Sequence, residues 1–151
     1  MRKPTSLRAR AAAALALSLA LALSLASAAR AEGTVELTAG MNLVQAEIAR
    51  SNDERERGLM FRALLPDNHG MVFLFPDRGR HCMWMRNTPI ALSVAFLDDD
   101  GTVANIEEMA PRTDATHCAA RAVRYALEMP GQWFARKGIR AGHQVRGLPA
   151  R

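Results

Sequence analysis

The sequence contains few of the residues and none of the spacings that usually identify a catalytic or zinc-binding protein. Cysteine occurs only twice in 151 residues, and the two do not form a Cys-x-x-Cys pair, the usual spacing in structural zinc sites. A His-Glu-x-x-His motif and a paired-carboxylate motif are absent, and no nucleophile elbow surrounds Ser93. The sequence therefore indicates no familiar hydrolytic or zinc-dependent chemistry.

An excess of either charge is also lacking once the N-terminus is set aside. The whole chain has 20 basic and 15 acidic residues, but residues 1–31 contain five of the basic ones and none of the acidic ones. Residues 32–151 therefore carry 15 charges of each sign and are formally neutral. Nucleic-acid binding requires a basic footprint that this part of the chain does not have, so we expect no nucleic-acid partner.

The first 31 residues have the pattern of a signal peptide. Basic residues lie within the first ten positions, an uncharged run rich in Ala and Leu extends over 11–26, and Ala29 and Ala31 occupy the positions that signal peptidase reads. We expect cleavage before Glu32, a periplasmic or secreted location, and no membrane association afterwards. The alternative is an uncleaved anchor, although the run is shorter than the roughly 20 residues of a spanning helix. No cysteine follows the run, so a lipoprotein is not indicated.

The rest of the chain predicts a single, mainly β domain over residues 32–151. Short segments of alternating or continuous apolar residues, separated by turns, predict about seven strands. The eight segments from which these strands are drawn are residues 34–38, 43–49, 71–75, 82–85, 90–97, 102–108, 123–129 and 144–146. Two short helices are expected at 53–60 and 132–137, and a polar loop at 110–120. Because the strand and helix alternation of a parallel sheet is missing, we predict a compact β-sandwich or small barrel. We also expect the domain to be a monomer.

One shared core is expected for the apolar strands, and Trp84 is expected to anchor it. The side chains assigned to this core are Met71, Phe73, Phe75, Trp84, Ile90, Leu92, Val94 and Phe96. Replacement of a buried Trp84 by Ala is then expected to cost about 3–5 kcal/mol of stability.

The two cysteines predict one disulfide, Cys82 to Cys118. An even number of cysteines in an exported chain is typical of a disulfide, and closing this 36-residue separation is worth on the order of 3–4 kcal/mol in the chain-entropy model. Each cysteine follows a histidine, His81 or His117, so a zinc site made of these four residues is the alternative. A copper site using methionines is a further alternative. The spacing favours the disulfide, and we expect no metal and no cofactor.

Several short motifs occur in the order found in a known family. They are Gly58-Leu-Met-Phe-Arg62, Gly70-Met-Val-Phe73, Trp84-Met-Arg-Asn-Thr88, Leu127-Glu128, and Gly138-Ile139 followed by Gly142. Over residues 41–148 the chain resembles the bacterial and archaeal family called domain of unknown function 192. The resemblance implies a compact, mainly β, often secreted or membrane-tethered domain without an established activity. His143 stands where that family usually has an acidic residue.

The polar residues of these motifs are the candidate ligand-binding site. The candidates are Arg62, Trp84, Arg86, Asn87, Thr88 and Glu128. A guanidinium group can grip a carboxylate or phosphate in a fork, and neighbouring amide and hydroxyl groups can orient it. The opposing interpretation is a structural network in which Glu128 pairs with an arginine and Asn87 bonds the backbone next to Pro89. We expect the polar side chains of Arg62, Arg86, Asn87 and Glu128 to meet at the rim of one cleft.

These observations favour a non-catalytic module that binds a small ligand or a partner protein. The alternatives are a hydrolase or transferase that uses the Arg, Asn and Glu side chains, and a periplasmic copper or zinc carrier. No catalytic residue is assigned.

The export hypothesis predicts the mass of the mature chain. Protein recovered from the periplasmic fraction should begin at Glu32 when its intact mass is measured. Full-length protein retained in the membrane fraction would replace the signal peptide with an anchor.

Overall fold

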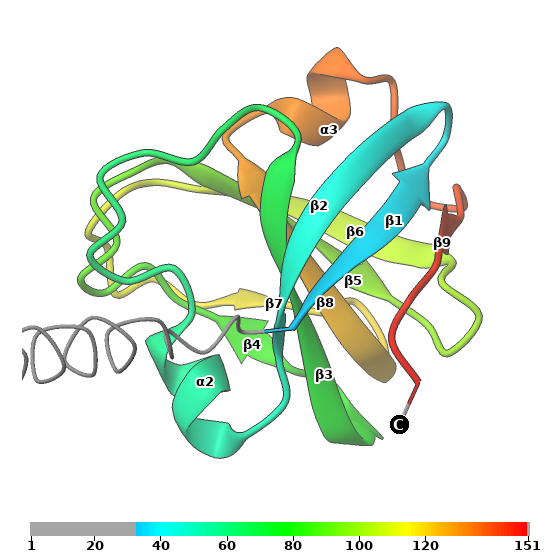
Figure 1. Ribbon diagram of the computed structural model, residues 1–151. Helices are drawn as coiled ribbons and strands as arrows, with labels where there is room; N and C mark the ends of the chain where they lie inside the picture. The colour runs from blue at the N-terminus through cyan, green and yellow to red at the C-terminus, as the bar shows by residue number, and fades with distance from the viewer. Residues whose placement is uncertain (1–32, 151) are drawn as a thin grey trace, which may run out of the picture. The chain divides into compact units, whose positions relative to one another are not determined.

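Residues 33–150 are described by a computed structural model in which seven strands form one strongly curled sheet (Figure 1). The order across this sheet is β6-β5-β8-β3-β2-β1-β9. Its strands are β1 (Thr34–Ala39), β2 (Asn42–Ala49), β3 (His69–Gly79), β5 (Leu92–Leu97), β6 (Val103–Met109), β8 (Val123–Pro130) and β9 (Val145–Arg146). A second sheet pairs β4 (Cys82–Met83) with β7 (His117–Cys118), and the helices are α2 (Asn52–Arg57) and α3 (Trp133–Arg136). The predicted mainly β class with two short helices is confirmed. The expected signal peptide lies outside the described residues.

The pairing of β2 with β3 departs from the sequence prediction because it is parallel. Parallel neighbours need a crossover, and here the crossover contains α2. Ser51 caps this helix, as its motif with Glu54 predicts. The helix ends at Arg57, earlier than expected, since Gly58 leaves the helical region with φ of 45°. One such crossover is too little to produce a recognisable strand and helix alternation in the sequence.

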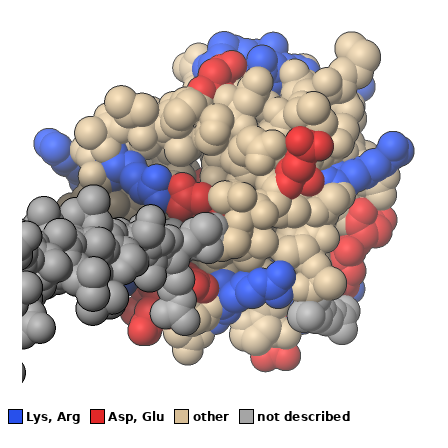
Figure 2. Space-filling model, viewed as in Figure 1, with Lys and Arg blue, Asp and Glu red and all other residues tan. Residues whose placement is uncertain are grey.

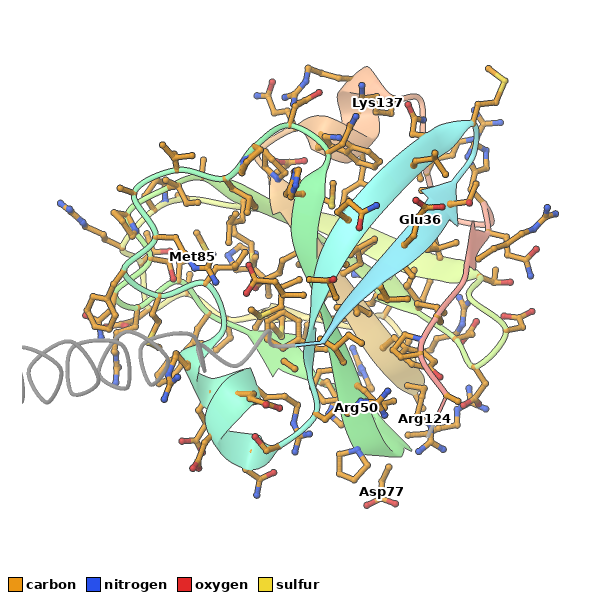
Figure 3. The ribbon with its side chains drawn as sticks, viewed as in Figure 1. Glu36, Arg50, Asp77, Met85, Arg124 and Lys137 are labelled. Carbon is orange, nitrogen blue, oxygen red and sulfur yellow. A yellow bond between two sulfur atoms is a disulfide. The ribbon has the colours of Figure 1, made fainter. Side chains whose placement is uncertain are left out.

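Apolar side chains cover both faces of the central strands. The inner core, on the face that α3 closes, contains Leu37, Val44, Val72, Leu97, Tyr125, Leu127, Trp133 and Phe134. The outer core contains Met71, Phe73, Phe75, Leu92, Val94 and Phe96, with Ile90 packed against it, as predicted. Leu59, Met83 and Met85 cover it from the loops, and Met85, labelled in Figure 3, is fully buried among them. The prediction that Trp84 anchors the core is wrong, because this residue is 39% exposed and belongs to neither core.

The small sheet holds these covering loops together through the predicted disulfide. Cys82 lies opposite Cys118 in the register of β4 and β7, with their Cα atoms 4.0 Å apart. The side chain of Asn105 on β6 ties β7 to the main sheet, because its Nδ2 donates to the Cys118 carbonyl at 3.1 Å and its Oδ1 accepts from Ala120 N at 2.9 Å. The expected loop 110–120 therefore contains a strand, which only its long-range pairing defines.

The two edges of the curled sheet approach each other at one end. Thr102 bridges Gln144, Val103 N donates to the His143 carbonyl at 2.8 Å, and Val145 N donates to the Gly101 carbonyl at 2.9 Å. This end is therefore closed like a barrel. Within the described residues, no helix is long and apolar enough to span a membrane.

The approach of the two edges predicts a specific requirement for glycine at position 101. Gly101 has φ of 84°, and a Cβ there would lie 2.0 Å from the Val145 carbonyl oxygen. Gly138 has φ of 68°, but a Cβ there meets nothing within 4 Å. Replacement by Ala should cost about 1–2 kcal/mol at Gly138, from the left-handed backbone alone, and clearly more at Gly101. Denaturant unfolding of both variants measures the difference, and equal losses would show that the contact is unimportant.

Candidate functional site

Arg86 and Asn87 of the family-like motif, together with the adjacent Pro89, form one wall of a surface cleft. The cleft has a volume of about 480 Å³ and is lined by Phe61, Arg86, Asn87, Pro89, Arg112 and Asp114. We call it the outer cleft. Arg86 and Asn87 are the two sequence candidates that line it.

Backbone hydrogen bonds hold the three loops of the outer cleft in place. Phe61 N donates to the Asn87 carbonyl at 2.8 Å, and Arg112 N donates to the Thr88 carbonyl at 3.0 Å. Phe61, Asn87 and Arg112 all have left-handed backbones, with φ of 63°, 59° and 56°. Asparagine adopts this region more readily than most residues, whereas a bulky side chain such as Phe61 does so at a cost. These contacts fix the direction in which each side chain leaves the wall.

Of the two arginines that line the outer cleft, one is paired with an acid and the other is not. Arg86 Nε donates to Asp114 Oδ1 at 2.8 Å, and the Arg86 guanidinium lies over the Trp84 ring, 4.4 Å from its centroid. Arg112 is exposed, and its side chain forms no hydrogen bond or ion pair with the described residues. One guanidinium group is therefore available to a ligand without breaking a protein contact.

Glu128 lies in a different, much smaller cavity. It sits on β8 between Met71 of β3 and Val94 of β5, on the face of the outer core, and only 3% of its surface is exposed. Its cavity of about 20 Å³ is lined by Arg55, Glu56, Arg57, Gly58, Leu59, Met60, Phe73, Met83, Trp84, Thr88 and Glu128. We call it the inner cavity. No described residue forms a hydrogen bond or ion pair with the Glu128 carboxyl group.

Burial raises the pKa of Glu128 to about 8, because the charged carboxylate loses its hydration and gains no compensating donor. The group is therefore mostly protonated at neutral pH. A buried acid with a strongly raised pKa that lines a cavity is a recognised indication of a functional site.

The remaining candidates do not share one rim, contrary to the sequence prediction. Arg62 pairs with Glu47, with Nη2 and Oε2 2.6 Å apart, and lines a third pocket, of about 170 Å³, which shares Arg57, Gly58 and Met60 with the inner cavity. Trp84 and Thr88 line the inner cavity with Glu128. The opposing interpretation, in which Glu128 pairs with an arginine, is not supported either, because no described arginine forms an ion pair with this carboxyl group. Ligand binding by these residues stays a prediction.

Four lining residues of the outer cleft were missed by the sequence analysis: Phe61, Pro89, Arg112 and Asp114. Phe61 lies inside a family-like motif but was assigned neither to the core nor to the binding site, and its side chain is 75% exposed. Arg112 and Asp114 lie in the segment expected to be a polar loop, and no sequence pattern indicates that this loop returns to residues 86–89.

The disulfide removes the zinc alternative that used both thiols. Cys82 and Cys118 are bonded to each other, so neither provides a thiolate ligand. In residues 33–150, no group of three or more His, Cys, Asp or Glu side chains is arranged to hold a metal ion.

Comparison with known proteins identifies relatives of the whole domain. Residues 34–147 match the family DUF192, described as "Uncharacterized ACR". A putative transcription regulator from Sinorhizobium meliloti is 31% identical, with 76% of this chain and 92% of that chain aligned at a TM-score of 0.71. A protein of unknown function from Novosphingobium aromaticivorans is 35% identical, with coverages of 75% and 83% and a TM-score of 0.68. No curated protein matches the chain.

The raised pKa of Glu128 makes stability depend on pH. In the unfolded chain this carboxyl ionises near 4.5, whereas in the folded protein it ionises at about 8. Between these values the unfolded chain releases a proton that the folded protein keeps, so the contribution of Glu128 to stability falls as the pH rises. Glu128→Gln carries no such penalty. Relative to the native chain, its stability should improve between pH 4 and pH 8, by on the order of 3 kcal/mol at pH 7.

Thermal or denaturant unfolding at several pH values tests this effect. Glu56→Gln is the matched control, because Glu56 is exposed at the rim of the same cavity and should show no comparable trend. A difference between Glu128→Gln and the native chain that does not change with pH would contradict the burial of an unpaired acid.

Proposed function

The chain belongs to the DUF192 family, and we propose that it is a non-catalytic binding domain for a small ligand that carries a carboxylate or phosphate group. The observation that carries the proposal is the unpaired guanidinium group of Arg112 in a cleft of about 480 Å³. Clefts of this size are typical of small-ligand sites, and a guanidinium group matches carboxylate and phosphate geometry.

The other side chains of the outer cleft restrict where the acid group of the ligand lies. Asp114 already neutralises Arg86 and would repel an anion placed beside it. The acid group is therefore assigned to Arg112. The Asn87 amide and the Asp114 carboxylate remain to accept hydrogen bonds from the rest of the ligand, and Phe61 and Pro89 offer apolar contact.

A hydrolase or transferase using Arg86, Asn87 and Glu128 together lacks support from the geometry. Glu128 lines the inner cavity, and the residues lining this cavity and the outer cleft do not overlap. Asp114 is the one acidic residue lining the outer cleft, and it is bonded to Arg86. These features favour binding over turnover.

The sequence and the charge distribution support the location and the kind of ligand that we propose. The N-terminal pattern supports export to the periplasm or beyond, and we keep a monomer as the working state. One neighbour is titled a putative transcription regulator. Figure 2 shows basic and acidic side chains interspersed over the visible face, without a continuous basic patch. This distribution, with equal numbers of acidic and basic residues in 32–151, favours a small acid over nucleic acid as the ligand.

The proposal predicts that Arg112 controls anion binding. Titration of the mature protein with succinate and with inorganic phosphate, followed by NMR, should give saturable shifts at the amides of Phe61, Asn87 and Arg112 for at least one of them. Arg112→Gln should weaken that binding about tenfold or more, because a hydrogen bond to a charged group is worth roughly 1.5–3 kcal/mol.

Arg140→Gln is the matched control, since Arg140 is also an exposed arginine without a side-chain contact to the described residues but lies outside the outer cleft. Equal weakening in both variants would indicate general electrostatic attraction. The absence of saturable shifts with either anion would reject the proposed function.

A further inference from the structure

The inner cavity adjoins a second surface groove that has a different character from the outer cleft. This groove has a volume of about 250 Å³ and is lined by Asn52, Arg55, Glu56, Phe73, Phe75, Cys82, Met83 and Trp84. Arg55, Glu56, Phe73, Met83 and Trp84 line both spaces, so the inner cavity lies next to the groove. The groove therefore brings aromatic and thioether side chains, together with Asn52, Arg55 and Glu56, next to the cavity of Glu128.

The size of the inner cavity limits what can lie beside Glu128. About 20 Å³ is room for one water-sized group, because a water needs roughly 10–15 Å³ of such space. A primary ammonium group has about this size. A trimethylammonium or guanidinium group is several times larger and requires the walls to move.

The chemistry of the walls favours a cation over an uncharged group. No hydrogen-bond donor of the protein reaches the Glu128 carboxylate, so a positively charged ligand group would provide the missing ion pair and hydrogen bond. Phe73 and Trp84 also line the cavity, and aromatic faces attract cations, although one face of the Trp84 ring already carries the Arg86 guanidinium. The buried Thr88 hydroxyl donates to the Arg86 carbonyl at 3.4 Å, which leaves its oxygen free to accept a hydrogen bond.

The charged neighbours of the inner cavity do not replace such a ligand. Arg55 is directed away, toward the carbonyls of Arg50 and Leu74 and the side chain of Asn52. Glu56 and Arg57 are exposed, carry opposite charges, and neither contributes to the shift at Glu128.

The flanking strands present only uncharged side chains to Glu128. Met71 lies opposite it on β3 and Val94 on β5. The covering loops contribute Met60, Met83, Trp84 and Thr88, which are also uncharged. Glu128 is therefore the one buried ionisable side chain among the residues that line this cavity.

We propose that the inner cavity binds a primary ammonium group at the end of an unbranched alkyl chain, with Glu128 as the counter-ion and the chain lying along Phe73, Met83 and Trp84. A free alkylamine and a lysine side chain share this chemistry. The site is separate from the outer cleft, so it stands whether or not an anion binds at Arg112.

Ammonium binding is coupled to the protonation of Glu128. The bound cation stabilises the carboxylate, so binding displaces a proton from the free protein. The affinity for an amine should therefore rise between pH 6 and pH 8. A ligand that uses the protonated acid as a hydrogen-bond donor would show the opposite trend.

The test compares n-butylamine with 1-butanol and butyltrimethylammonium on the mature protein at pH 8, with the Trp84 indole resonance followed by NMR. Butylamine should give saturable shifts, and the other two probes should bind at least about tenfold more weakly. Glu128→Gln, which is expected to fold stably, should weaken butylamine binding by a similar factor. Glu36→Gln, at an exposed glutamate of β1 that lines neither space, should bind as the native chain does, which separates the buried carboxyl from an exposed one.

Two further probes distinguish the sources of the amine. Stronger binding of 1,5-diaminopentane would indicate a free amine, and stronger binding of Nα-acetyl-lysine methylamide would indicate a lysine side chain. Either result supports the proposal. Equal binding of butylamine and butanol, unchanged binding in Glu128→Gln, an affinity that falls between pH 6 and pH 8, or no saturable shift would overturn it.

Discussion

The structure depends on the burial of β3, β5 and β8 on both faces. A sheet with two apolar faces needs two covering layers, and a domain of this length has only two short helices to offer. The inner face is closed by the curl of the sheet and by α3. The outer face is covered mainly by the loops around residues 58–65 and 84–90 and by the β4–β7 pair. The disulfide between Cys82 and Cys118 stabilises this second layer, because irregular loops have little regular hydrogen bonding of their own.

Local sequence patterns predicted the features that depend on residues close together in the chain. Alternating and continuous apolar runs located the main strands, and the even number of cysteines predicted their pairing. The parallel pairing of β2 with β3, the strand β7 and the return of Arg112 to residues 86–89 depend on contacts between distant segments. Trp84 shows the same limit. Its size suggested a core residue, but its neighbours Met83 and Met85 fill the outer core, and the tryptophan ring lies on the surface beneath Arg86.

Glu128 shows how an apparent solvent-facing position becomes a buried acid. Arg124, Ala126 and Glu128 share one face of β8 by their alternation, and the sequence gives no reason to separate the two charged ones. Near the beginning of the strand, Arg124 pairs with Asp99, with Nε and Oδ1 3.0 Å apart (Figure 3). Further along the strand, loops cover the same face, so Glu128 is enclosed. Glu128 is buried because loops cover this end of β8. The face of the strand on which it lies does not explain the burial, since Arg124 lies on the same face.

The segment Gly58–Arg62 separates the two candidate binding spaces. Gly58, Leu59 and Met60 line the inner cavity, whereas Phe61 lines the outer cleft. The backbone hydrogen bond from Phe61 to Asn87 holds the loop in place between Met60, which lines the inner cavity, and Phe61, which lines the outer cleft. The Asn87 amide also lies 4.0 Å from Met60 Sδ. Because both residues that form the backbone bond are held in left-handed conformations, this part of the loop has few alternative geometries. An unpaired guanidinium and an unpaired carboxyl therefore stay on opposite sides of one short loop instead of neutralising each other. The separation leaves each group available to the ligand that we propose for it.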